Sequence, residues 1–90
     1  MTLLYGMEIK PKKKSKKKGQ DELTKLGKRI KSLRIAKGYT NYEYFAYENN
    51  LPRAQYGRYE KGEDLRFSSL VKVINAFDMT LNEFFSEGFE

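Results

Sequence analysis

The chain is organised around the stretch from Thr40 to Gly62, whose centre reads Leu51-Pro52-Arg53-Ala54-Gln55-Tyr56-Gly57-Arg58-Tyr59-Glu60. Pro52 fixes a φ angle that suits the first turn of a helix, so it predicts a helix start. Gly62 predicts the end of the same helix, because glycine readily takes the left-handed conformation that follows a last turn. We therefore expect one short helix at the centre of the chain.

The two sides of this helix differ in chemistry. At about 3.6 residues per turn, Tyr56 and Tyr59 fall on one face. The other side carries Arg53, Ala54, Gln55 and Arg58. One side is apolar, and the other can donate hydrogen bonds.

Length and composition limit what the chain can be. Its 90 residues, of which 39% are hydrophobic, support one small domain with a modest core. The absence of cysteine and histidine excludes a disulfide framework, thiolate or imidazole metal sites, and catalytic triads built on these residues. We therefore expect no metal and no cofactor.

The chain also lacks the usual signals for a membrane or for export. No apolar run reaches the roughly 18 residues that a membrane span requires. Residues 1–9 lack the positively charged start of a secretory signal. The expected location is the cytoplasm, in association with the nucleoid.

The formal charge of +6 is concentrated at one end. Residues 1–20 hold seven lysines and one acid (7 − 1 = +6), whereas residues 21–90 hold eleven basic and eleven acidic side chains. Dense like charges repel one another and bury nothing, so residues 1–20 are predicted to be a disordered basic arm and residues 21–90 the folded domain. The arm is either a solvated tail or a segment that follows the phosphates of a nucleic acid.

The first part of the predicted domain is helical. Apolar residues recur at three- and four-residue spacing from Asp21, and Gly38 closes this helix; the apolar positions are Leu23, Leu26, Ile30 and Leu33, with Lys25, Lys28, Arg29 and Lys31 between them. Thr40 or Asn41 then caps a second, short helix. Its expected apolar members are Tyr44, Phe45 and Tyr47.

A tight turn joins the second helix to the central one. Asn49-Asn50 ends the second helix, and asparagine tolerates the left-handed conformation that such a turn needs. Leu51 is expected to fill the angle between the two helices. Two short helices with so brief a connection are expected to cross near a right angle, as a helix-turn-helix.

Two more helices are predicted after Gly62. Ser68 or Ser69 caps the fourth, which carries Leu70, Val73, Ile74 and Phe77 on one face. Thr80 opens the fifth, and Glu83 completes a capping box. Leu81, Phe84 and Phe85 supply its apolar side, and the aromatic residues left over near the terminus, among them Phe89, either form a dimer contact or cover the first helix.

The segment Leu26 to Phe85 resembles the lambda-repressor-like, XRE-type helix-turn-helix regulators. The resemblance rests on Leu26 to Arg34, on Gly38-Tyr39-Thr40, on Phe45-Ala46, on Arg58 to Gly62 and on the ending Leu70 to Phe85. It implies an all-α, five-helix DNA-binding domain whose third helix, Pro52 to Lys61, enters the major groove, usually as a homodimer on a two-fold operator.

The resemblance also implies roles for particular residues. Ala46 lets the second and third helices approach, and Asn50 takes a turn position usually held by glycine. Arg34 and Glu60 match a partly buried ion pair between the first and third helices. The base-reading positions are Arg53, Ala54, Gln55 and Arg58. The phosphate-contacting position at the start of the second helix is Asn41 or Tyr42, of which we prefer Asn41; the remaining backbone candidates are Thr40, Tyr56, Lys61 and Lys28.

Side-chain geometry favours Arg53 and Gln55 as readers of base edges. The planar guanidinium matches the O6 and N7 acceptors of guanine, and glutamine can both donate to and accept from adenine. Arg58 reads a base or holds a phosphate, and a surface ion pair with Glu60 or Glu63 is the less favoured role. Gly57 costs about 1 kcal/mol inside a helix relative to alanine. It either permits close approach to DNA or is merely tolerated.

Other functional classes fit less well. Scattered carboxylates, with no glycine-rich phosphate loop and no metal spacing, argue against an enzyme. The stronger alternative is an interaction module, either the antitoxin of a toxin–antitoxin pair or a partner-binding adaptor, that uses the C-terminal aromatic surface. The sequence favours a repressor that binds a double-stranded DNA operator.

Overall fold

The computed structural model describes residues 19–90, and within them the chain forms five helices and no strand. The helices are α1 (Gln20–Ala36), α2 (Tyr42–Glu48), α3 (Arg53–Glu60), α4 (Phe67–Ala76) and α5 (Leu81–Phe84). The all-helical prediction is therefore confirmed for the described part of the chain. Nearly all of the predicted basic arm, residues 1–18, lies outside the described residues.

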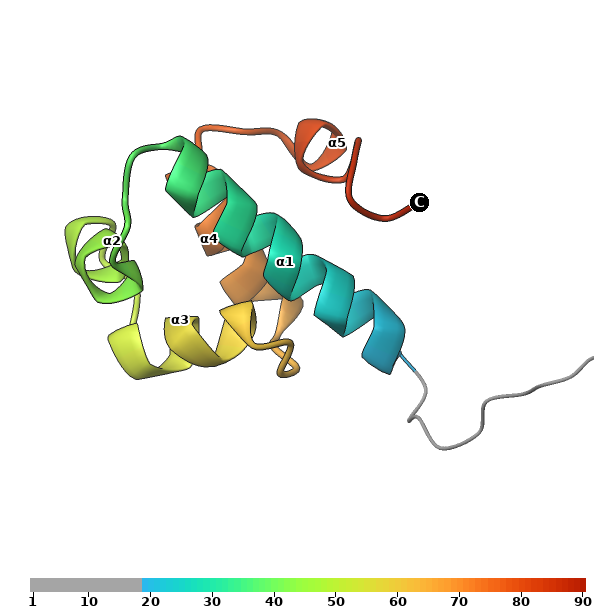
Figure 1. Cartoon of the computed structure of the whole chain (residues 1–90), viewed down its shortest axis with the longest axis horizontal. Helices are drawn as coiled ribbons and strands as arrows, with labels where there is room; N and C mark the ends of the chain where they lie inside the picture. Colours follow the sequence, from blue (N-terminus) through green and yellow to red (C-terminus); the bar gives the residue numbers. More distant parts are fainter. Residues whose placement is uncertain (1–18) are drawn as a thin grey trace, which may run out of the picture.

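The long helix α1 organises the arrangement of the others. It runs diagonally in front of α4, with α2 and α3 on one side and α5 on the other (Figure 1). α3 packs against both α1 and α2, and α4 packs against α5. In the same view α2 is seen nearly along its axis while α3 lies across the picture, so the two helices cross steeply, as expected from their short connection.

Local sequence signals explain the starts of α2 and α5. The side chain of Asn41, not that of Thr40, caps α2 and accepts hydrogen bonds from the backbone N–H groups of Glu43 and Tyr44 at 2.7 and 3.1 Å. The capping box predicted at Thr80 and Glu83 is present at the start of α5.

The start predicted at Pro52 is confirmed to within one residue, and the start predicted at Ser68 or Ser69 needs correction. α3 begins at Arg53, and Pro52 is its N-cap, with no side-chain cap. α4 begins at Phe67, before the serines that we expected to cap it, and its N-cap is Arg66, again without a side-chain bond. Each of these helices thus starts without the serine, threonine or asparagine that usually accepts from its first N–H groups.

The buried face of α2 also differs from the prediction. Phe45 and Ala46 are fully buried, whereas Tyr44 and Tyr47 are 55% and 68% exposed. Tyr44 and Tyr47 were therefore wrongly assigned to the apolar face. A helix of seven residues has fewer than two full turns, so its apolar face is too short for spacing alone to define it.

Aromatic rings link the helices inside the core. Phe45 is the central ring: it stacks on Phe77 at a centroid distance of 5.1 Å and lies 5.3 Å from Tyr56. The other buried hydrophobic residues around it are Leu26, Ile30, Ala46, Leu51, Tyr59, Leu70, Val73, Ile74 and Phe84. One core therefore joins all five helices.

The close approach of α1 to α3 depends on Gly27. A Cβ atom at this position would lie 2.7 Å from the carbonyl oxygen of Glu60 and 2.9 Å from that of Tyr59. Both distances are below van der Waals contact, and both involve backbone that cannot swing away. The absence of a side chain at position 27 thus allows the short distance between α1 and the C-terminal end of α3.

Arg29 is buried, although its place in the sequence pattern of α1 suggested a solvated side chain. Only 8% of it is exposed. Its guanidinium donates to the carbonyl oxygens of Phe84 at 2.8 Å and Glu83 at 3.1 Å, and it pairs with the Glu87 carboxylate at 3.2 Å. Arg29 therefore caps the C-terminal end of α5, which has only four residues of its own.

Candidate nucleic-acid interface

The two sides of α3 have opposite environments. Tyr56 is fully buried and Tyr59 is 9% exposed, so the inward-facing tyrosines are confirmed. The four predicted base-reading residues are all exposed: Arg53, Ala54, Gln55 and Arg58. The helix thus presents two guanidinium groups and an amide to solvent, and a packed core supports it from behind.

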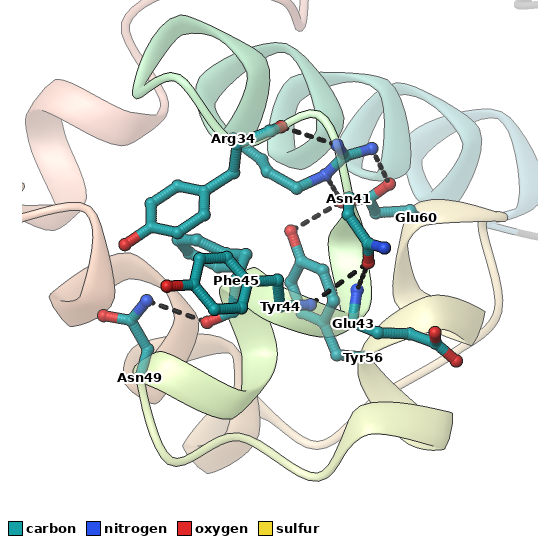
Figure 2. A network of polar contacts seen from close by, with 9 residues as sticks. Arg34, Asn41, Glu43, Tyr44, Phe45, Asn49, Tyr56 and Glu60 are labelled. Atoms are coloured by element: carbon teal, nitrogen blue, oxygen red, sulfur yellow. Dashed lines mark hydrogen bonds and ion pairs between the residues drawn. The ribbon is translucent and has the colours of Figure 1, made fainter.

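An ion pair holds α3 against α1, as the resemblance implied. The Arg34 guanidinium donates from Nε to Glu60 Oε2 at 2.8 Å and from Nη2 to Glu60 Oε1 at 2.9 Å, a bidentate geometry. Both side chains are more than nine-tenths buried. Arg34 also donates to the carbonyl oxygen of Tyr39 at 2.8 Å, so it ties the loop before α2 to the same point (Figure 2).

Tyr56 of α3 is the third member of this network. Its hydroxyl donates to Glu60 Oε2 at 2.6 Å (Figure 2). Burial, together with the hydrogen bond to the carboxylate, raises the pKa of Tyr56 far above its ordinary value, because both favour the neutral phenol. The hydrogen bond to Glu60 likewise raises the pKa of Arg34. We therefore withdraw Tyr56 from the predicted phosphate contacts, since its hydroxyl is buried and already bonded.

The turn between α2 and α3 has the predicted geometry. Asn50 adopts a left-handed conformation with φ of 57°, and the Leu51 N–H donates to the carbonyl oxygen of Ala46 at 2.8 Å. The Asn49 amide donates to the carbonyl oxygen of Phe45 at 2.9 Å. Leu51 is buried, so the turn is pinned both by hydrogen bonds and by an apolar side chain.

Two shallow cavities connect the exposed side of α3 to its neighbours. One, of about 460 Å³, includes Gln55 and Arg58 together with the acidic residues Glu63 and Asp64 and with Arg66 and Ser69 near the start of α4. The other, of about 340 Å³, includes Arg53 and Asn41 together with Tyr44 and Tyr47 of α2. The predicted base-reading residues therefore lie beside Asn41, and also beside Arg66, a residue that sequence analysis did not single out.

The remaining backbone candidates are distributed unevenly. Thr40, Asn41 and Lys61 are exposed and flank α2 and α3. Lys28 is exposed as well, but it lines a different cavity, with Ser32, Glu87 and Gly88 at the C-terminal segment. The role of Lys28 as a phosphate contact stays a prediction.

Arg58 has a partner that we had rated unfavourable. Its Nε lies 3.7 Å from Glu63 Oε1, and both side chains are about half exposed. An exposed pair at this distance contributes little and is easily exchanged for another partner. The surface ion pair is therefore present, but Arg58 can exchange Glu63 for another partner. Arg53, in contrast, has no ion pair within residues 19–90.

The structure explains Gly57 in a way that sequence analysis missed. The ring of Tyr42, the first residue of α2, lies directly over it, and a Cβ at position 57 would be 2.6 Å from the ring atom Cε1. Neither close approach to DNA nor mere tolerance describes this packing. The glycine itself was the signal, since a glycine inside an amphipathic helix indicates a close neighbour without identifying it.

Other kinds of site are not evident in the described part of the chain. Residues 19–90 contain no cluster of three or more aspartate, glutamate, histidine or cysteine side chains arranged to hold a metal ion. None of the described helices is long and apolar enough to cross a membrane. Comparisons of the chain with protein-family models, with curated proteins and with solved structures found no match.

Proposed function

We propose that this chain is a sequence-specific, double-stranded DNA-binding transcriptional regulator with a lambda-repressor-like fold of the XRE type. In this proposal α3 enters the major groove, and binding at a promoter represses transcription by occlusion. The protein acts in the cytoplasm on DNA of the nucleoid.

One observation carries the proposal: the core and the Arg34–Glu60 ion pair hold the inward side of α3, and none of the outward residues of α3 itself is acidic, although Glu43, Glu63 and Asp64 of neighbouring segments lie beside them. Glu60, the one acid of α3, is turned inward and neutralised by Arg34. The outward side chains can donate to base edges and phosphates without facing a carboxylate of their own helix.

The chemistry of the outward residues matches the major groove. Arg53 can place two N–H groups against guanine O6 and N7, and the Gln55 amide can pair with adenine N6 and N7. Arg58, Thr40, Asn41 and Lys61 supply contacts to phosphates, which fix the register of the helix on the duplex. Ala54 is small enough to let the helix approach the bases closely.

The proposal includes a homodimer, with the C-terminal aromatic surface as its contact. Phe84 is fully buried, but Phe85 and Leu81, one turn apart, are 43% and 42% exposed. Phe85 lies 4.9 Å from the ring of Phe89, so these side chains form one apolar strip. A dimer would place two copies of α3 on successive turns of one DNA face.

The direct test is selection of bound duplexes from a random pool, followed by measurement of Gln55→Ala on the selected operator. We expect a symmetric consensus, and a loss of about 1–3 kcal/mol for Gln55→Ala that is confined to one base position of each half-site. Gln20→Ala is the matched control, because Gln20 lies at the start of α1. Failure of the wild-type chain to enrich any sequence would refute the proposal.

A second candidate is the antitoxin or adaptor function, and the exposed Leu81 and Phe85 favour it. In that case the C-terminal aromatic surface binds a protein partner such as a toxin. Phe85→Ser would then abolish a heterocomplex and leave the DNA affinity of a monomer unchanged. In the homodimer proposal, Phe85→Ser instead reduces affinity for the two-fold operator while affinity for a single half-site is retained.

A further inference from the structure

The C-terminal aromatic surface, formed by Leu81, Phe85 and Phe89, is left open by the rest of the described structure. Leu81 and Phe85 are 42% and 43% exposed, and the half-buried ring of Phe89 lies 4.9 Å from that of Phe85. Phe84, in contrast, is fully buried in the core. Because burial of apolar surface is favourable by about 25 cal/mol per Å², an apolar segment that covers this surface lowers the free energy of the molecule.

This surface lies beside the first half of α1. The Lys25 side chain of α1 donates to the carbonyl oxygen of Glu90 at 3.1 Å, and a Cβ at Gly88 would be 3.4 Å from Cδ of Arg29. α1 begins at Gln20, so the preceding chain enters the fold at this same end of the helix. At about 1.5 Å per residue, Gln20 and Arg29 are about 14 Å apart along the helix axis.

The segment that precedes α1 has two parts of different chemistry. Residues 10–18 contain seven lysines, whereas residues 1–9 include the apolar side chains Leu3, Leu4, Tyr5, Met7 and Ile9. An extended chain spans at most about 3.6 Å per residue, so residues 10–18 can bridge up to about 32 Å. This span exceeds the distance along α1 to Arg29. Residues 1–9 can therefore reach the C-terminal aromatic surface.

Charge distinguishes this surface from the other exposed aromatic side chains. Tyr44 and Tyr47 of α2 share a cavity with Arg53, and residues 21–61 carry nine basic and five acidic side chains. Residues 77–90 carry no basic side chain and four acidic ones, namely Asp78, Glu83, Glu87 and Glu90. A run of lysines is therefore repelled from the surroundings of α2 and attracted to those of α5.

The acidic side chains near α5 can accept further partners. Glu87 and Asp78 each pair with a basic residue of α1 or its C-cap, yet they remain 71% and 87% exposed. Lys25 and Lys28 border the C-terminal segment on the α1 side, so the lysine run is expected along the α5 side, next to Glu83 and Glu87. Exposed ion pairs are weak one by one, and apolar burial supplies the rest of the attraction.

We propose that, in the free monomer, residues 1–9 of the same chain cover the C-terminal aromatic surface while the lysines of residues 10–18 pair with the acidic side chains of residues 77–90. The inference concerns the chain without DNA and does not depend on the proposed function. Where that function also holds, residues 1–9 and the second copy compete for the same surface. Dimer formation then releases residues 1–18, whose lysines become free to contact phosphates.

A nitroxide label at position 2 of the full chain tests this contact. The chain contains no cysteine, so Thr2→Cys provides a single attachment point. The measurement uses DNA-free protein at a concentration where sedimentation shows a monomer. The backbone amide NMR signals of Leu81, Phe85 and Phe89 should lose most of their intensity relative to the reduced label. The signals of α2 should keep theirs.

Variants of the labelled chain separate apolar cover from charge. Leu3→Ser combined with Leu4→Ser changes no residue of the core, so the fold should persist and the intensity at Phe85 should return. Glutamine in place of the lysines of residues 10–18 should restore part of the intensity, and added salt should do the same when the lysines are present. Tyr47→Ser is the matched control: it removes an aromatic side chain that is 68% exposed on α2, and the loss at Phe85 should stay unchanged.

The outcomes separate this inference from its alternatives. An equal loss at α2 and at the C-terminal aromatic surface, no loss at either, or no recovery with Leu3→Ser and Leu4→Ser overturns it. A loss in isotope-labelled chains that carry no nitroxide, mixed with nitroxide-labelled ones, shows that a second copy supplies the segment and also overturns it. Operator selection is measured separately, so a chain that selects DNA without the selective loss disproves only this inference. A chain that shows the loss but selects no DNA disproves only the proposed function.

Discussion

At the scale of single residues, Tyr56 belongs both to the apolar core and to the polar network that holds α3 against α1. Its ring fills the core between Phe45 and Tyr59, with centroid distances of 5.3 and 6.4 Å. Its hydroxyl bonds the carboxylate that Arg34 also holds. Apolar packing and the buried polar network therefore meet at the same residue, and a network of this kind is stable only when all its members are satisfied.

The raised pKa of Tyr56 predicts a loss of stability at alkaline pH. The unfolded chain titrates near the ordinary value of 10, while the folded chain keeps the proton to higher pH. The contribution of the Tyr56 hydroxyl to stability is therefore fully present below pH 10. The free energy of unfolding falls as the pH rises above that value. Urea denaturation of the wild type and Tyr56→Phe at several pH values between 8 and 11 measures the difference.

The quantity to follow is the difference in free energy of unfolding between the wild type and Tyr56→Phe. At pH 8 the variant should be less stable than the wild type by about 1 kcal/mol, the contribution of one hydrogen bond. This difference in free energy of unfolding should become smaller above pH 10, because the wild type loses the contribution of Tyr56 there, whereas phenylalanine does not titrate. A difference that is constant across the whole range would contradict the burial of the hydroxyl.

At the scale of elements, the contact between α1 and α3 is the one on which the candidate interface depends. Gly27 allows the carbonyl oxygens of Tyr59 and Glu60 to lie against α1, and Arg34, seven residues further along α1, holds the carboxylate of the same Glu60. The end of α3 is thus fixed by both shape and charge. α5 depends on α1 in a different way, through the guanidinium of Arg29.

Gly27→Ala is expected to destabilise the fold, although alanine is the better helix former. The new Cβ would meet backbone oxygen at 2.7 Å, so α3 must move, at a cost of about 1–3 kcal/mol, which exceeds the gain of up to about 1 kcal/mol in helix propensity. Ser32→Ala, on the exposed side of α1, is the control and should be neutral or slightly stabilising. The measurement is chemical denaturation, and equal stability of Gly27→Ala and the wild type would show that α3 does not seat at this distance.

At the scale of the whole molecule, charge is divided along the chain. Residues 1–20 carry +6, residues 21–61 carry nine basic and five acidic side chains, and residues 62–90 carry two and six. The net positive charge therefore lies in the N-terminal segment and in the part that contains α1 to α3. In the proposed complex this distribution orients the chain with its basic part toward DNA before any base is contacted.

Deletion of residues 1–18 is expected to weaken binding to all DNA sequences by a similar factor. Each phosphate that loses a lysine partner should flatten the dependence of log affinity on log salt concentration by about 0.9. Titrations of operator and random duplexes at several salt concentrations measure this slope. A full-length variant with glutamine in place of the lysines of residues 1–18 separates the effect of charge from that of length. Identical salt slopes for the wild type and the deletion would show that the segment does not contact DNA.

The sequence was a good guide wherever the determining interaction is local. Asn50 in its left-handed turn and the capping box at Thr80 depend on residues no more than three positions apart. The inward side of α3 follows from helical spacing, because Tyr56 and Tyr59 share a face by geometry. The serines expected to cap α4 show the limit of this approach: α4 begins at Phe67, with Arg66 as an N-cap that has no side-chain bond, so the local capping rule did not locate the start of this helix.

The sequence by itself determined the all-helical class, the short central helix and the separation of its tyrosines from its arginines and glutamine, because these depend on periodicity and on backbone preferences of nearby residues. Only the tertiary structure decided that Arg29 is buried against α5, that Gly27 seats α3 on α1, and that Gly57 lies under Tyr42. Gly27 and Arg29 meet residues more than thirty positions away, and Gly57 meets a ring from another helix. Side chains brought together by the packing of different helices leave no periodic trace in either segment, so the chain must be folded before such contacts can be known.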